Sequence, residues 1–145
     1  MSYDGYMQDP PKDSRTEPSI FTRIINGEIP CHKVFEDDRT LAFLNIYPVQ
    51  PGHVLVIPKL QVEFVWDLPD AEYQALMSTV KLVAVHVRSV VDAPYMHSRV
   101  VGVHVPHAHV HLIPFHDPDE LGVEPDSSIE PDHATLAAMA KKLMF

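Results

Sequence analysis

The sequence lacks the features that mark several common classes of protein. It has a single cysteine, Cys31, so it forms neither an intrachain disulfide framework nor a zinc ribbon built from cysteines. No apolar run approaches the roughly 20 residues of a membrane-spanning helix, and the start of the chain lacks the apolar core of a secretory signal. We therefore expect a cytoplasmic protein with no membrane partner.

Basic residues are also scarce. The chain has 11 Lys and Arg against 20 Asp and Glu, which gives a formal net charge of −9 with ten histidines counted as neutral. Affinity for duplex DNA comes mostly from Lys and Arg on phosphates, so nucleic acid is not an expected partner. A small phosphorylated ligand is compatible with this charge, because histidines and backbone N–H groups can hold it locally.

Composition divides the 145 residues into one domain and two polar flanks. Residues 1–18 hold several prolines and few apolar side chains, which predicts a disordered N-terminal tail. Residues 19–115 are apolar and periodic and form the predicted domain. Residues 116–145 begin with seven carboxylates and no Lys or Arg between positions 117 and 132, which predicts an acidic, extended connector before a C-terminal helix. An acidic docking segment is the alternative to a plain surface loop.

The periodicity of the domain predicts an α+β fold. Runs rich in β-branched and aromatic residues predict strands at residues 34–36, 40–46, 53–57, 95–101 and 107–113. Apolar residues at intervals of three and four predict one long helix over residues 73–91, with Pro69 in its first turn. Shorter helices are expected at residues 19–25 and 132–142. Strands grouped with one long helix, without alternation of strand and helix, indicate an antiparallel sheet of about five strands.

Five of the ten histidines lie between residues 104 and 116. Three of them, His107, His109 and His111, alternate with small or apolar residues. Side chains on a strand alternate between its faces, so these three imidazoles are expected to share one face. Buried imidazoles need polar partners, so a row of three indicates a functional site rather than packing.

Two chemistries are compatible with this row. In the first, two imidazoles bind zinc and further ligands complete the site. Alternate residues on a strand lie about 6.5–7 Å apart, so three imidazoles do not converge easily on one ion, and His53, His104 or a carboxylate would have to contribute. In the second, one imidazole is a covalent nucleophile and its neighbours orient it and handle protons. Both alternatives stay open on these residues alone.

Residues 107–113 follow the pattern His-φ-His-φ-His-φ-φ, in which φ is apolar, and this pattern resembles the signature of the histidine-triad (HIT) family. The resemblance extends over roughly residues 19–115 and includes Ile29-Pro30 and the segments 34–38, 41–43 and 51–58. It implies a HIT-like fold and a purine nucleotide or nucleotide conjugate as the ligand. It also implies a two-fold homodimer, for which the many valines of residues 80–91 are suitable, and we expect no cofactor.

The resemblance further implies a hydrolase or transferase that cleaves a phosphoramidate or phosphoanhydride bond at the α-phosphate. His109 would attack phosphorus and form a nucleotidyl-histidine, which water would then hydrolyse. The backbone carbonyl of His107 would hold the remaining proton of His109. His111 would contact phosphate oxygens, and His53 would protonate the leaving group.

A nucleoside pocket can be carried over from the same resemblance. The residues expected to sandwich the base are Phe21, Ile25, Phe43, Leu44 and Ile46. Asn45 is expected at the ribose hydroxyls, while His104 and the backbone amides near Val105 are expected at the phosphates. The alternative for the apolar residues of this set is a place in the hydrophobic core.

The sequence departs from the family pattern at two places. Ser19, Thr22 and Gln61 stand where relatives with a structural zinc have two cysteines and a histidine, so we expect no metal. Val103 stands where many members have a glutamine that contacts phosphate. Because valine cannot donate such a hydrogen bond, a non-catalytic nucleotide-binding or scaffold protein of the same fold is the alternative to an active hydrolase.

Overall fold

A five-stranded antiparallel sheet is the centre of the computed structural model, which describes residues 17–145. The strands lie in the order β1-β2-β3-β5-β4 and comprise β1 (Lys33–Glu36), β2 (Thr40–Leu44), β3 (Val54–Pro58), β4 (Tyr95–Arg99) and β5 (Val110–Phe115). The predicted α+β class and antiparallel sheet are therefore confirmed. The predicted disordered tail lies almost entirely outside the described residues.

Within residues 17–145, three α-helices pack around the sheet: α3 (Ile20–Ile25), α4 (Asp70–Val91) and α5 (His133–Leu143). The long helix α4 begins after Pro69, which is its N-cap residue rather than part of its first turn as predicted. Acidic residues in the first turn and Arg88 in the last turn complement the helix dipole. Asp92, in the left-handed conformation with φ 53°, ends the helix. No helix within residues 17–145 is long and apolar enough to cross a membrane, and the cytoplasmic location stays a prediction.

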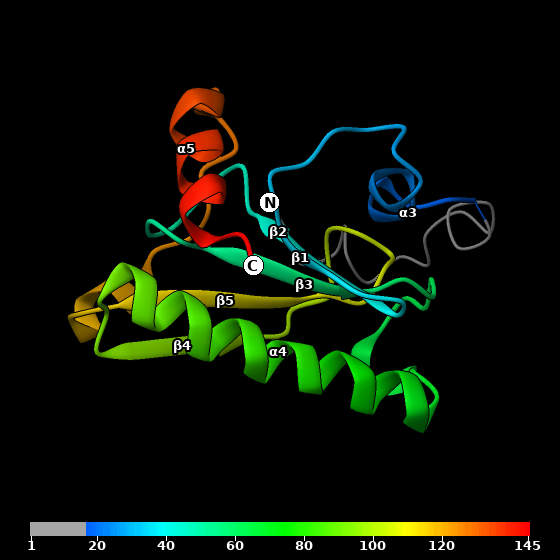
Figure 1. Cartoon of the computed structure of the whole chain (residues 1–145). Helices are drawn as coiled ribbons and strands as arrows, with labels where there is room; N and C mark the ends of the chain where they lie inside the picture. Colours follow the sequence, from blue (N-terminus) through cyan, green and yellow to red (C-terminus); the bar gives the residue numbers. More distant parts are fainter. Residues whose placement is uncertain (1–16) are drawn as a thin grey trace.

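The two faces of the sheet carry different layers, because side chains alternate along each strand. On one face, Phe21 of α3 packs against residues of β2 and β3, namely Leu41, Phe43, Leu55 and Ile57. On the other face, residues of β2, β3 and β5 pack against α4 and α5, with Ala42, Leu44, Val54, Val56, Val110 and Leu112 among them. In Figure 1, α4 accordingly runs along the sheet, and α3 lies apart from α4.

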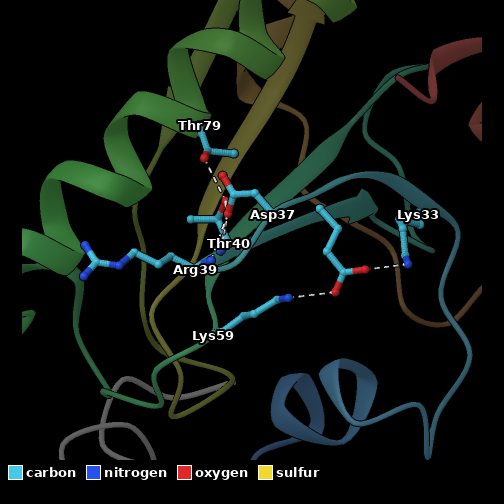
Figure 2. A network of polar contacts seen from close by, with 7 residues as sticks. Lys33, Asp37, Arg39, Thr40, Lys59 and Thr79 are labelled. Carbon is cyan, nitrogen blue, oxygen red and sulfur yellow. Dashed lines mark hydrogen bonds and ion pairs between the residues drawn. The ribbon is translucent and has the colours of Figure 1, made fainter.

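The β1–β2 hairpin is fixed by one aspartate. Asp37 Oδ1 accepts hydrogen bonds from the backbone N–H of Arg39 at 2.9 Å and of Thr40 at 2.8 Å, which closes the turn. The Thr40 hydroxyl lies 2.8 Å from Asp37 Oδ1 and 2.7 Å from the hydroxyl of Thr79 on α4 (Figure 2). This buried contact ties the hairpin to the long helix.

The segment of the three alternating histidines differs from its prediction. A strand was expected over residues 107–113, but β5 begins only at Val110. The reason lies in β3, which pairs with β5 up to Val56 opposite Val110 and ends at Pro58. A proline has no N–H to continue the ladder, and the N–H of Ala108 instead donates to the carbonyl of Val62 at 2.7 Å. The triad therefore spans the entry into a strand.

The acidic connector is also less extended than predicted. A 3₁₀ helix occupies Pro118–Gly122, and the Asp117 carboxylate caps it by accepting from the N–H of Asp119 at 2.9 Å. Farther along, the carboxylate of Glu124 reaches Arg99 on β4 at 2.8 Å. Most other side chains of the connector are exposed. The connector is thus attached to the sheet through the last residue of β4.

Candidate active site

Four histidines meet on β5 and beside it: His107, His109 and His111 at the entry into β5, and His53 directly before β3. His53, His107 and His109 are buried, at 0%, 0% and 6% exposure, and His111 is partly exposed on β5. The rings of His109 and His111 lie 5.3 Å apart, and those of His53 and His111 lie 5.2 Å apart. The structure therefore brings together all four histidines that the sequence nominated for catalysis.

His109 has a defined tautomer. Its Nδ1 lies 2.7 Å from the backbone carbonyl oxygen of His107, which can only accept a hydrogen bond, so Nδ1 carries the proton. The lone pair is then on Nε2. Burial lowers the pKa of His109 from its ordinary value, against the weaker opposing effect of the His107 carbonyl. At neutral pH the ring is a neutral imidazole with an available nucleophilic nitrogen.

The ring of His107 is held between two segments. Its Nε2 lies 2.7 Å from the carbonyl of Pro58 at the end of β3, so Nε2 carries the proton and donates. Its Nδ1 then accepts from the hydroxyl of Ser19, the N-cap residue of α3, at 2.7 Å. Burial lowers the pKa of His107 as well. These two bonds fix the ring and, with it, the backbone carbonyl that holds the proton of His109.

Ser19, Thr22 and Gln61, which stand at the positions of the zinc ligands of some relatives, form a hydrogen-bonded cluster. Gln61 Oε1 accepts from the N–H of Ser19 at 2.8 Å and from the hydroxyl of Thr22 at 2.7 Å. The amide nitrogen of Gln61 donates to the carbonyl of Glu17 at 2.8 Å. Across residues 17–145, no group of three or more His, Cys, Asp or Glu side chains is arranged to hold a metal ion. This cluster instead connects α3 to His107 through hydrogen bonds.

His53 and His111 form a second ordered pair. The N–H of Val49 donates to His53 Nδ1 at 3.1 Å, so the proton of His53 is on Nε2. That nitrogen lies 3.0 Å from His111 Nδ1 and donates to it, which leaves Nε2–H of His111 as a donor toward the open side of the site. Burial, followed by nearby positive charge, lowers the pKa of His53 to about 3 and that of His111 to about 4.

The aromatic residues expected around the base lie beside the triad. The rings of Phe21 and Phe43 are 5.6 Å apart in an edge-to-face arrangement, and Phe21 is also 5.1 Å from the ring of His109. Ile25 is partly buried against the same cluster, as is Val105, whose backbone was expected at the phosphates, and Ile46 is 38% exposed. Three of the residues expected around the base, Phe21, Ile25 and Phe43, therefore share one apolar patch next to His109.

Leu44 is a correction to the predicted pocket. It is 2% exposed and packs in the core on the α4 side of the sheet, because adjacent residues of a strand point to opposite faces. Phe43 and Leu44 therefore cannot both line one pocket. For Leu44 the alternative, a place in the hydrophobic core, is the one observed.

Asn45 and His104 occupy different surroundings. Asn45 is 9% exposed, its Oδ1 accepts from the N–H of Tyr47 at 2.8 Å, and its Nδ2 lies 3.4 Å from His53 Nε2. His104 is exposed on the segment between β4 and β5. In its protonated form, His104 lowers the pKa of both His109 and His111. Contacts of Asn45 with ribose and of His104 with phosphate stay predictions.

Strand β4 contributes two residues that the sequence did not nominate. His97 lies opposite Ile113, and Arg99 lies opposite His111, in the antiparallel pairing of β4 with β5. Directly opposite residues share one face of a sheet, so Arg99 is on the face of His111. The signal was present in the alternation of His97 and Arg99 along the predicted strand, but the partner strand and its register are known only from the fold.

Comparison with known proteins agrees with this geometry. The HIT domain family matches residues 26–117. An uncharacterized HIT-like protein of Methanocaldococcus jannaschii is 39% identical over 104 residues, which cover 69% of this chain and 81% of that protein. The adenosine 5′-monophosphoramidase of Schizosaccharomyces pombe is 36% identical over 99 residues, which cover 66% of this chain and 72% of that enzyme.

The fold comparison leads to the same family. A crystal structure of a HIT-like protein from Bartonella henselae superposes with a TM-score of 0.74 at 28% identity, over 86% of this chain and 93% of that chain. It supports the sheet and helix arrangement described above. Because the HIT domain matches well over half of the chain and the three alternating histidines lie in one site, the protein belongs to the HIT family.

Proposed function

We propose that the protein hydrolyses a phosphoramidate or phosphoanhydride bond at the α-phosphate of a purine nucleotide, through a nucleotidyl-histidine formed at His109. The observation that carries this proposal is the 2.7 Å contact between His109 Nδ1 and the carbonyl of His107. It directs the lone pair of a neutral imidazole outward from Nε2. The similarity to the S. pombe adenosine 5′-monophosphoramidase supports a nucleotide substrate.

The reaction has two displacement steps at phosphorus. First, His109 Nε2 forms a bond to the α-phosphorus while the bond to the leaving group breaks and its electron pair stays with the leaving group; an amine leaving group also takes up a proton from water. The positive charge on the modified ring is stabilised because Nδ1–H donates to the His107 carbonyl. Water then replaces His109 at phosphorus, releasing the nucleoside monophosphate and a proton and restoring the neutral imidazole.

His111 and His53 act on the phosphate as a pair in this proposal. The Nε2–H of His111 donates to a non-bridging oxygen and stabilises the charge that develops there. His53 lies behind His111, fully buried, with its own Nε2–H engaged by His111. We therefore assign His53 a positioning role through His111, in place of the direct proton transfer to the leaving group that the resemblance implied.

The apolar patch beside His109 is the proposed site of the base. Phe21 and Phe43 offer ring edges and faces, Ile25 and Val105 complete the patch, and exposed Ile46 is proposed as a further contact of the base. Stacking on aromatic side chains is a common way to bind a nucleobase and is tolerant of its identity. The base therefore lies over α3 and β2, and the phosphates point toward the histidines.

Steady-state hydrolysis with matched binding measurements tests this proposal. His109→Ala is expected to abolish hydrolysis of adenosine 5′-phosphoramidate and of diadenosine polyphosphates, because the nucleophile of the proposed covalent bond is removed. Calorimetric affinity for AMP should change little, since the base contacts come from other segments. Near-normal turnover by His109→Ala would overturn the covalent mechanism.

A non-catalytic nucleotide-binding protein is the second candidate. Val103 favours it, because an apolar side chain that is 43% exposed precedes the triad and supplies no donor to phosphate. Under this alternative, the wild-type protein binds AMP but cleaves neither substrate class. The same turnover and binding measurements therefore separate the two candidates.

We also propose that two copies form a homodimer through α4. Met77, Leu82 and Val85 are exposed on this helix, at 37%, 48% and 53%. Exposed apolar side chains grouped on one helix are typical of an interface between protein surfaces. Strand β4 lies at the edge of the sheet, so it can also pair with a second copy.

A further inference from the structure

Arg99 is a charged residue at the site to which the reaction described above gives no part. It is the last residue of β4 and lies directly opposite His111 in the sheet. It therefore points to the same face as His111, at the end of the site that is distant from Phe21 and Phe43. A nucleotide with its base over those aromatic rings directs its phosphates toward Arg99.

The guanidinium of Arg99 has unused capacity to donate hydrogen bonds. Its side chain is 20% exposed, and Nη1 donates to the Glu124 carboxylate at 2.8 Å. Its Nε is buried, and no hydrogen-bond partner for that atom lies among the described residues. A buried N–H without a partner is costly, and a guanidinium matches the oxygens of a phosphate or sulfate with two parallel bonds. The guanidinium therefore has N–H groups with which it can bind an anion.

The electrostatic surroundings point to the same ligand. Arg99 and His97 both lower the pKa of His53 and of His111 through their positive charge, and His104 does so for His111. The four site histidines are neutral at neutral pH, so Arg99 supplies permanent positive charge beside them. The one carboxylate bonded to it, Glu124, is 73% exposed and comes from the connector rather than from the sheet. An incoming anion can replace a carboxylate held this loosely.

We propose that Arg99 binds a charged leaving group of the nucleotide, a phosphate or sulfate, and that Glu124 holds the guanidinium until that group replaces it. This inference rests on the proposed function and predicts that anhydrides are cleaved more efficiently than phosphoramidates. In the first step the N–P bond to His109 forms, and the P–O bond to the leaving group breaks with its electron pair on the leaving oxygen. Arg99 stabilises that oxyanion, whereas an amine leaving group would need a proton that buried His53 cannot deliver directly.

Three substrates and three variants test this inference. Arg99→Gln is expected to lower kcat/KM for diadenosine tetraphosphate and adenosine 5′-phosphosulfate roughly 10- to 100-fold, the usual effect of losing a charge-assisted pair. It should change kcat/KM for adenosine 5′-phosphoramidate by less than about threefold, because that leaving group is uncharged. A larger loss for the tetraphosphate than for the phosphosulfate would identify the polyphosphate chain as the ligand, and the reverse would identify sulfate.

Glu124→Gln provides a variant on the surface that does not depend on the stability of the sheet. Removing the competing carboxylate is expected to lower KM for the anionic substrates several-fold while leaving the phosphoramidate unchanged. Glu130→Gln replaces another exposed carboxylate of the same connector by a carboxamide. It is the matched control and should change KM for neither class of substrate. Equal effects of Arg99→Gln on charged and uncharged leaving groups, or no effect of Glu124→Gln, would overturn the inference.

Binding distinguishes a failure of this inference from a failure of the proposed function. In the His109→Ala background, ADP should bind more tightly than AMP, and Arg99→Gln should remove that difference. If wild-type protein cleaves no substrate but the ADP preference depends on Arg99, the hydrolase proposal fails and the anion site stands. If ADP and AMP bind equally, the anion site fails whatever the turnover.

Discussion

Three of the four site histidines have a defined proton position because each contacts a group that can only donate or only accept. The carbonyls of His107 and Pro58 accept from His109 and His107, and the N–H of Val49 donates to His53. The tautomer of His111 then follows from that of His53. An imidazole site can therefore be buried and neutral, with a lone pair on His109 Nε2 and an N–H on His111 Nε2 left for the proposed substrate.

The buried histidines make stability depend on pH. Burial lowers the pKa of His53 to about 3 and of His111 to about 4, from an ordinary value of 6.5. Below pH 6.5 these histidines are protonated in the unfolded chain but stay neutral in the folded protein. The free energy of unfolding must therefore fall as the pH falls toward those values. We expect a loss on the order of 1–2 kcal/mol per histidine between pH 7 and 5.

Urea unfolding at several pH values measures this loss, and His53→Gln is the informative variant. It should flatten the dependence between pH 7 and 5, because one of the titrating groups is gone. Replacement of an exposed histidine, His116→Gln, should leave the slope unchanged. A free energy of unfolding that is the same at pH 7 and pH 5 would contradict the burial of neutral imidazoles.

At the scale of elements, much of the fold was predictable from local sequence. The short helix expected at residues 19–25 is α3, which has Ser19 as its N-cap residue, and the gap between the strands expected at residues 34–36 and 40–46 is the turn that the Asp37 carboxylate closes. The periodicity of α4 gave its extent within a few residues. These signals are local, because caps and turns are made by the residues that encode them.

Two of the differences between prediction and structure have non-local causes, and the error at Leu44 has a local one. The start of β5 depends on where its neighbour β3 ends, which the periodicity of residues 107–113 does not contain. Leu44 was misplaced because family resemblance was followed where strand alternation pointed to the opposite face. Arg99 and Glu124 are 25 positions apart, and only the folded chain brings them together. Pairwise contacts of this kind have no signature in a single sequence.

The short helix α3 is expected to support catalysis through Ser19. Ser19→Ala removes both the hydroxyl that donates to His107 Nδ1 and the cap that accepts from the N–H of Thr22 at 3.0 Å. We expect a loss of roughly 1–2 kcal/mol in the free energy of unfolding. We also expect a lower kcat with little change in KM, because the His107 carbonyl would no longer be held in place for His109.

Denaturant unfolding and steady-state kinetics measure the two effects separately. Ser127→Ala, in an exposed turn of the connector, is the matched control and should change neither quantity. If Ser19→Ala behaved like this control in both measurements, the cluster of Ser19, Thr22 and Gln61 would have no part in positioning the triad.

At the scale of the whole molecule, the sheet separates two tasks. One face carries α3, the aromatic patch and the histidines, and the other carries α4, α5 and the larger core. Substitutions on the outer surface of α4 can therefore change assembly without touching the site. Figure 1 shows this long helix on the side of the sheet that is away from α3.

The proposed homodimer makes a prediction at this scale. Light scattering at micromolar concentration should give the mass of two chains for the wild type, and Leu82→Lys combined with Val85→Glu should give the mass of one. Charges placed in an apolar interface lose their hydration and oppose association. Ile129→Glu, at an apolar residue that is 64% exposed in the connector, should leave the mass unchanged. A monomeric wild type would contradict the dimer.

The central claim is that His109 becomes covalently bound to the nucleotide during turnover. Rapid-quench mass spectrometry of the protein mixed with a cleavable adenosine substrate tests it most directly, because peptide mapping locates the modified residue. We predict a transient adduct of one nucleoside monophosphate on His109, absent in His109→Ala and still formed, more slowly, in His111→Ala. Turnover without any adduct, or an adduct on another residue, would contradict the account.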